Sequence, residues 1–147
     1  MELQTYLNNA VAGIRKETFD KSDQLTLGEI ISKIEAIMLD GKTPDVVFDF
    51  EYAYPSGIDS WRGSYSELAL EFGIEHGDLQ PMKIIEFHKM LKETVGKTLT
   101  GYKGGEFVMT RHTPVWVANY GNSGNTAVIE VVDKGWEVIL MTGYGEF

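Results

Sequence analysis

The stretch YPSGIDSWRGSYSEL, residues 54–68, combines side chains that suit the binding of an anion. Arg62 is the only cation between Thr43 and Met82, a segment with eight carboxylates. Its guanidinium offers a planar fork of donors for phosphate or carboxylate, and the same plane can stack on a base. Aromatic faces, hydroxyl groups and glycines that allow close backbone approach surround it. These neighbours are Ser60, Trp61, Gly63, Ser64 and Tyr65.

A purely structural interpretation of this stretch is equally open. In that case Arg62 forms an ion pair with Asp59 or Glu67, and the two aromatic side chains fill the core. Loops carry function more often than strands do, which keeps the binding interpretation in place.

Two further stretches are similar in kind. In GYKGGEF, residues 101–107, Lys103 follows Tyr102 and precedes Gly104 and Gly105, so backbone amides could approach an anion. A glycine-rich hairpin turn with an exposed lysine is the alternative. In TPVWVANYGNSGNT, residues 113–126, Trp116 and Asn119 lie at the end of an expected strand. An asparagine there can read an amide or base edge, or cap the turn.

Other chemistry has weaker support. GKT occurs at residues 41–43 and 96–98, but neither copy has the earlier glycine of a phosphate-binding P-loop, and both are expected at helix C-termini. The three histidines lack metal-ligand spacing.

Asp45, Asp49 and Glu51 share one face of an expected strand, which suits a hard cation. A solvated strand face is the preferred interpretation. No serine–histidine–aspartate arrangement stands out, so no catalytic residue, metal or cofactor is predicted.

Composition limits the class of protein. The chain has 147 residues, which predicts a single domain over residues 1–147. It has no cysteine, so it lacks disulfides and thiolate chemistry. Neither a signal peptide nor an 18-residue apolar run is recognisable, so we expect no membrane partner. The net charge of −9 argues against direct nucleic-acid binding and allows docking on a basic partner.

Hydrophobic periodicity predicts three helices, at about residues 3–17, 26–40 and 81–96. The second begins at a capping box of Thr26 and Glu29. Strands are predicted at 46–50, at 68–74 with alternating burial, and in four stretches of the last third. Residues 51–64 are predicted to form a loop. The expected fold is α+β: one mostly antiparallel sheet of about six strands with three helices packed on it, and residues 1–25 as a variable N-terminal helix.

Residues 26–142 resemble a family of small proteins encoded by tailed bacteriophages. The resemblance rests on the aspartate–phenylalanine strand before SWRGSY, on GYKGGEF and on TPVWVANYG. It implies phage origin and action in the cytoplasm of the infected bacterium. Matched residue by residue, the family signature falls on Ser60, Trp61, Arg62, Gly63, Tyr65, Tyr102, Lys103, Gly104, Gly105, Trp116 and Asn119.

Two functions of different class follow as hypotheses. The first is a counter-defence protein that binds and sequesters a nucleotide-type immune signal, such as a cyclic nucleotide or an ADP-ribose derivative. The second is an acidic inhibitor of a basic host protein. An enzyme that cleaves the same ligand with carboxylates or His112 is a weaker third. Aromatic residues in and beside the loops predict a homo-oligomer.

Overall fold

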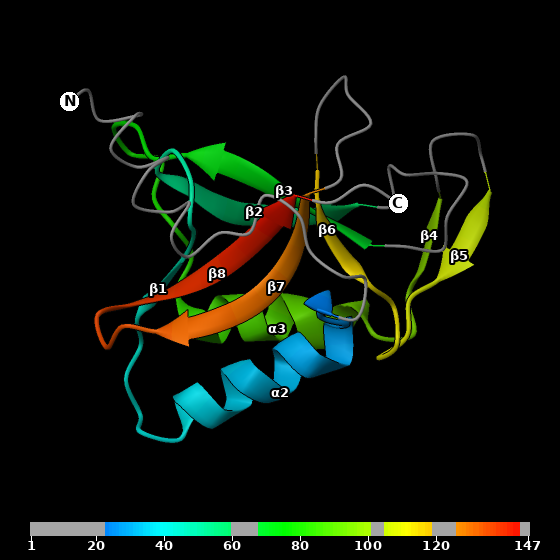
Figure 1. The fold of residues 1–147 in the computed structure, drawn as a ribbon, viewed down its shortest axis with the longest axis horizontal. Helices are drawn as coiled ribbons and strands as arrows, with labels where there is room; N and C mark the ends of the chain where they lie inside the picture. Colours follow the sequence, from blue (N-terminus) through cyan, green and yellow to red (C-terminus); the bar gives the residue numbers. More distant parts are fainter. Residues whose placement is uncertain (1–22, 60–67, 101–104, 119–125, 145–147) are drawn as a thin grey trace.

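The computed structural model describes residues 23–59, 68–100, 105–118 and 126–144 (Figure 1). Two α-helices and eight β-strands occupy these ranges. The helices are α2 (Leu27–Met38) and α3 (Ile84–Thr94). The strands are β1 (Asp45–Phe48), β2 (Ala53–Asp59), β3 (Leu68–Ile74), β4 (Thr98–Thr100), β5 (Glu106–Val108), β6 (Val115–Val117), β7 (Thr126–Asp133) and β8 (Glu137–Tyr144).

Six strands form one sheet in the order β1-β8-β7-β6-β3-β2, and β4 pairs with β5 in a separate two-stranded sheet. The α+β class is confirmed, but the prediction of a mostly antiparallel sheet is wrong, because β1 pairs parallel with β8 and β3 pairs parallel with β6. The chain between β3 and β6 contains α3, the kind of long crossover that parallel neighbours require. The two outer strands, β1 and β2, also lie next to each other, so the sheet is nearly closed into a barrel.

Both described helices lie on one side of this sheet and pack against each other (Figure 1). The helix predicted at residues 3–17 lies outside the described residues, which therefore hold two helices rather than three. The helices and the sheet share one apolar core. Its fully buried members include Leu27, Ile30, Ile34, Leu68, Leu70, Phe87, Leu91, Val115 and Leu140.

The start of α2 confirms the predicted capping box. The hydroxyl of Thr26 accepts from the amide of Glu29, and the Glu29 carboxylate accepts from the amide of Thr26. Two glycines with positive φ follow the helices, Gly41 at 80° and Gly96 at 85°. Both GKT stretches therefore follow helix C-termini, as the sequence predicted.

Three strand predictions need correction. Residues 51–64 were expected to be a loop, yet β2 begins at Ala53 and pairs antiparallel with β3. The register shifts between Pro55 and Gly57, an irregularity that an outer strand tolerates. The strand β3 is confirmed, but its burial does not alternate, because its first three residues are all buried. β4 had no counterpart in the sequence prediction.

Candidate ligand-binding site

Most of the residues predicted to bind a ligand lie outside the described ranges. These are Ser60, Trp61, Arg62, Gly63, Tyr65, Tyr102, Lys103, Gly104 and Asn119. The structure does describe Gly105, Trp116 and the residues that flank each predicted segment. These flanking residues show which strands lie next to each predicted segment.

A continuous row of paired residues crosses the sheet where two of the predicted segments begin or end. Asp59 of β2 is opposite Ala69 of β3, which is opposite Trp116 of β6, which is opposite Ala127 of β7. Neighbouring strands are about 4.8 Å apart, so Asp59 and Trp116 are separated by roughly 10 Å across the sheet. Asp59 and Leu68, which flank segment 60–67, lie at the start of β3, whereas Ala118, which precedes segment 119–125, lies further along β3, where its amide donates to the carbonyl of Leu70 at 2.8 Å.

Trp116 is the centre of this row and is only 2% exposed. The sequence suggested that it contacts a ligand at a strand end. In the structure it lies within β6, between β3 and β7, and its indole presents almost no surface. A direct role toward a ligand stays a prediction, whereas the burial of Trp116 is observed.

The third predicted segment belongs to the β4–β5 hairpin, which is separate from the six-stranded sheet. Thr100 is opposite Glu106, so residues 101–104 connect paired strand ends, and half-buried Gly105 follows them. The hairpin is anchored at its other end by Met109, which is fully buried in the core. The amide of Gly96 donates to the Met109 carbonyl at 2.7 Å, and the Met109 amide donates to the Lys97 carbonyl at 2.8 Å.

The three acidic residues considered as a cation site have different environments. Asp45 forms an ion pair of 2.7 Å with Lys83. Asp49 accepts two hydrogen bonds from Thr142, so the preferred prediction of a solvated strand face is wrong at this position. Glu51 is exposed in the turn after β1. Among the described residues, no three histidine or acidic side chains are arranged to hold a metal ion.

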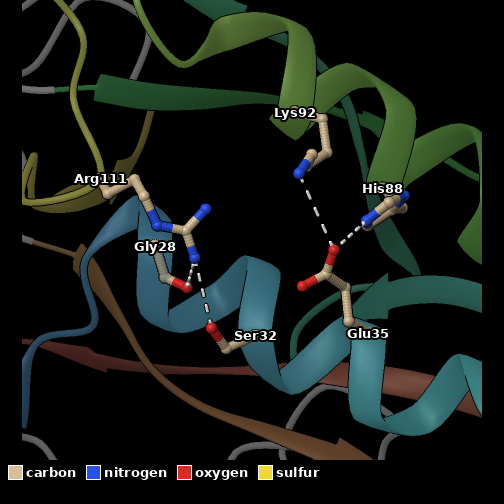
Figure 2. A network of polar contacts seen from close by, with 6 residues as sticks. All are labelled: Gly28, Ser32, Glu35, His88, Lys92 and Arg111. Carbon is tan, nitrogen blue, oxygen red and sulfur yellow. Dashed lines mark hydrogen bonds and ion pairs between the residues drawn. The ribbon is translucent and has the colours of Figure 1, made fainter.

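Figure 2 shows a polar network that the sequence did not reveal. His88 and Lys92 of α3 point toward the carboxylate of Glu35 on α2, with nitrogen–oxygen distances of 3.0 and 4.0 Å. The hydrogen bond from His88 is the largest influence and lowers the pKa of Glu35 below its usual value. Desolvation opposes this shift, and the charges of Lys92, His88 and Arg111 add smaller lowering effects. The signal in the sequence was the i,i+4 spacing of His88 and Lys92, which places both on one helix face.

Arg111 forms the second half of this network. Its guanidinium donates to the carbonyl of Gly28 at 3.3 Å and to the hydroxyl of Ser32 at 3.4 Å. These contacts hold the segment before β6 against α2. The network therefore joins α2 to α3 and to the chain that leads into the Trp116 row. His112, considered as an acid–base group, is an exposed neighbour of Arg111.

Fold and site together define an α+β protein with a mixed, nearly closed six-stranded sheet and a separate hairpin. No protein family, curated protein or solved structure matches the chain in the comparisons made. Within the described ranges, no helix is long and apolar enough to cross a membrane.

Proposed function

We propose that this protein binds and sequesters a nucleotide-type anion. The proposed setting is that of a phage-encoded counter-defence protein, acting as a homo-oligomer in the cytoplasm of the infected bacterium. The ligand class is a cyclic nucleotide or an ADP-ribose derivative. Arg62 and Lys103 would bind phosphate, and Trp61, Tyr65 and Tyr102 would stack on the base or ribose.

The observation that carries this proposal is the strand register around Trp116. Asp59, Ala69 and Trp116 are consecutive partners across β2, β3 and β6. The described residues that flank the stretch with Arg62 and the stretch with Asn119 therefore belong to neighbouring strands of one sheet, with β3 between β2 and β6. A site supported by a sheet holds its contacts with less loss of conformational entropy than a site on free loops.

The arrangement of charge also favours small-ligand binding over imitation of nucleic acid. A nucleic-acid mimic needs carboxylates in a row on one face. Several described carboxylates instead form ion pairs at separate places in the fold. Asp45 pairs with Lys83, Glu130 with Lys33, and Glu93 with Lys89.

The first experiment identifies the ligand and tests for chemistry at once. The purified chain is incubated with a panel of cyclic nucleotides and ADP-ribose derivatives, washed, and heated to release what it holds. Mass spectrometry of the released fraction is expected to return an unchanged panel member. Release of a cleaved product would replace sequestration with an enzymatic function, and release of nothing from any panel member would refute nucleotide binding.

The second experiment asks whether the predicted residues make the site. Arg62→Ala is expected to weaken binding by about 2–5 kcal/mol, the range for removing one partner of a desolvated charge pair. Arg62→Lys should recover only part of this, because an ammonium lacks the planar fork. Lys103→Ala should weaken binding too, non-additively with Arg62→Ala if both cations contact one ligand.

Lys134→Ala is the matched control, since Lys134 lies in the exposed turn between β7 and β8. It should leave binding unchanged. Melting temperatures of all variants are measured in parallel. A lower melting temperature for Arg62→Ala with undiminished binding would assign Arg62 a structural role instead.

A further inference from the structure

Two exposed segments meet at the end of the sheet where β1 turns into β2. The first is the turn at Glu51 and Tyr52, and the second is residues 74–80, every one of which is exposed. They are held together by backbone contacts. Ala53 is the strand partner of Ile74, and the amide of Glu75 donates to the carbonyl of Tyr52 at 3.1 Å.

The second segment is itself held in shape by hydrogen bonds. The amide of Leu79 donates to the carbonyl of His76 at 3.0 Å, and the reverse bond is 3.3 Å long. The Gln80 side chain donates to the carbonyl of Gly77 at 3.0 Å. The surface that these two segments form is therefore preorganised, which lowers the entropy cost of binding a partner.

Three apolar side chains project from this surface. Tyr52 is 54% exposed, Ile74 40% and Leu79 58%. Isolated exposed apolar residues are ordinary on proteins, but here three belong to two hydrogen-bonded segments. The combination of a tyrosine with two aliphatic side chains is typical of the centre of a protein–protein contact.

Acidic side chains accompany these apolar groups. Glu51, Glu75 and Asp78 belong to the same two segments and are exposed. In the described part of the chain none of the three carboxylate groups has an ion-pair or hydrogen-bond partner, unlike that of Asp45, which binds Lys83 at 2.7 Å. No lysine or arginine occurs between residues 63 and 82. The surface is thus apolar with an acidic margin and no neutralising cation from its own segments.

The backbone of the turn adds an independent observation. Glu51 and Tyr52 have φ values of 47° and 57°, a region that glycine and asparagine occupy far more readily. Retaining a glutamate and a tyrosine at two such positions favours a role for their side chains at the surface.

We propose that this surface, formed by Glu51, Tyr52, Ile74, Glu75, Asp78 and Leu79, docks a partner protein through a basic, partly apolar segment. Apolar side chains of the partner would lie against Tyr52 and Leu79, and flanking lysine or arginine side chains would pair with the three carboxylates. Charge complementarity selects a basic partner over a second copy of this chain, because two such acidic margins would repel each other. The proposal uses none of the residues assigned to nucleotide binding and does not depend on that function.

The test is a titration of the 15N-labelled full chain with a synthetic peptide of two leucines flanked on each side by two lysines. Saturable amide shift changes are expected to concentrate at residues 51–53 and 74–80. A peptide with serine in place of leucine, and one with glutamate in place of lysine, should both bind more weakly. Leu79→Ser should lower the affinity about tenfold, as loss of an apolar contact at the centre of an interface does.

Charge is tested by the double variant Glu75→Gln/Asp78→Asn, which should bind the lysine peptide several-fold more weakly and with less dependence on salt. The control Glu93→Gln/Glu106→Gln removes the same charge elsewhere and should leave binding unchanged. Shifts spread over carboxylates throughout the molecule, or full affinity in Leu79→Ser, would overturn the proposal. Concentration-dependent shifts at the same residues without peptide would also overturn it, and would assign the surface to self-association.

Discussion

Thr142 donates both its hydroxyl and its backbone amide to the carboxylate of Asp49, at 2.6 and 2.9 Å. Asp49 follows β1 directly, and Thr142 is a fully buried residue of β8. The two strands pair in parallel up to Phe48 and Leu140. The carboxylate therefore extends the contact between β1 and β8 just where the chain turns toward β2.

Asp49→Ala is expected to lower the free energy of unfolding by about 1–3 kcal/mol, because it leaves a buried hydroxyl and amide without their acceptor. Thr142→Val removes the hydroxyl with little change in shape and should cost less. The double variant should lose less than the sum of the two, since both act on one interaction. Urea denaturation measures all three.

Asp45→Asn is the control for this series. Asp45 pairs with Lys83 at the surface, where both side chains are more than one-third exposed, so its loss should change stability by at most about 1 kcal/mol. An Asp49→Ala variant no less stable than Asp45→Asn would contradict a structural role for Asp49.

The turn between β1 and β2 should become more stable when it carries the residue pair that usually occupies its turn type. The amide of Ala53 donates to the carbonyl of Phe50 at 2.8 Å, and both central residues have positive φ, which defines a type I′ geometry. Asn-Gly is the favoured pair for this turn. Glu51→Asn/Tyr52→Gly should therefore stabilise the fold by about 1 kcal/mol, raising the melting temperature by about 2–4 °C.

A substitution outside the turn tests whether the gain in stability comes from the turn itself. Ser56→Gly, at an exposed position of β2, should lower stability, because glycine weakens a strand. If the turn variant melted at or below the wild-type temperature, Glu51 and Tyr52 would not be strained in this turn, and their positive φ values would no longer support the docking surface.

Gly28 should resist replacement by alanine even though it lies within a helix. Alanine is normally better than glycine there by about 1 kcal/mol. At this position, however, a Cβ would lie 2.8 Å from Cβ and 2.9 Å from the carbonyl oxygen of Arg111. The Gly28 amide already donates to that oxygen at 2.9 Å, so the backbone cannot separate without losing the bond.

We expect Gly28→Ala to destabilise the protein by about 1–3 kcal/mol, the usual cost of overpacking. Ser32→Ala, one turn later on the exposed face of α2, provides the comparison. It removes only the exposed 3.4 Å hydrogen bond from Arg111 and should cost less than Gly28→Ala. Thermal unfolding distinguishes them. A Gly28→Ala variant as stable as wild type would show that the Arg111 segment can move away from α2.

These relationships show which parts of the fold were predictable from sequence. The start of α2 was predictable because its capping box involves residues only three positions apart, Thr26 and Glu29. The parallel pairing of β1 with β8 was not, because Asp45 and Glu137 are far apart in the sequence and no local pattern encodes strand direction. β2 was missed because Pro55 and Gly57 are typical of loops, and pairing with β3 overrides that preference.

The candidate site was predictable to a similar degree. Residue type identified Trp116, but a tryptophan suits a core as well as a ligand site, and only the fold shows it to be buried. Glu35 was not noticed, because its partner His88 lies 53 positions away on another helix. Pairings between distant elements thus account for most of what the sequence left open.

The contact between Glu35 and His88 predicts how the stability of the fold changes at acid pH. The hydrogen bond from His88 is the main cause of the lowered pKa of Glu35, and the charge of Lys92 acts in the same direction. A carboxylate whose pKa is lower in the folded than in the unfolded state stabilises the fold above its unfolded value, here 4.5. That contribution is lost as the pH falls below 4.5 and through the folded pKa.

His88→Leu should therefore raise the pKa of Glu35 toward 4.5, and Lys92→Met should raise it by a smaller amount. The side-chain carbonyl resonance of Glu35, followed by NMR against pH, reports this directly. In denaturation experiments, Glu35→Gln should be less stable than wild type near neutral pH, and the difference should disappear in acid. Glu106→Gln, outside the network, controls for the loss of a negative charge. An unchanged Glu35 titration in His88→Leu would show that the interhelical hydrogen bond does not set this pKa.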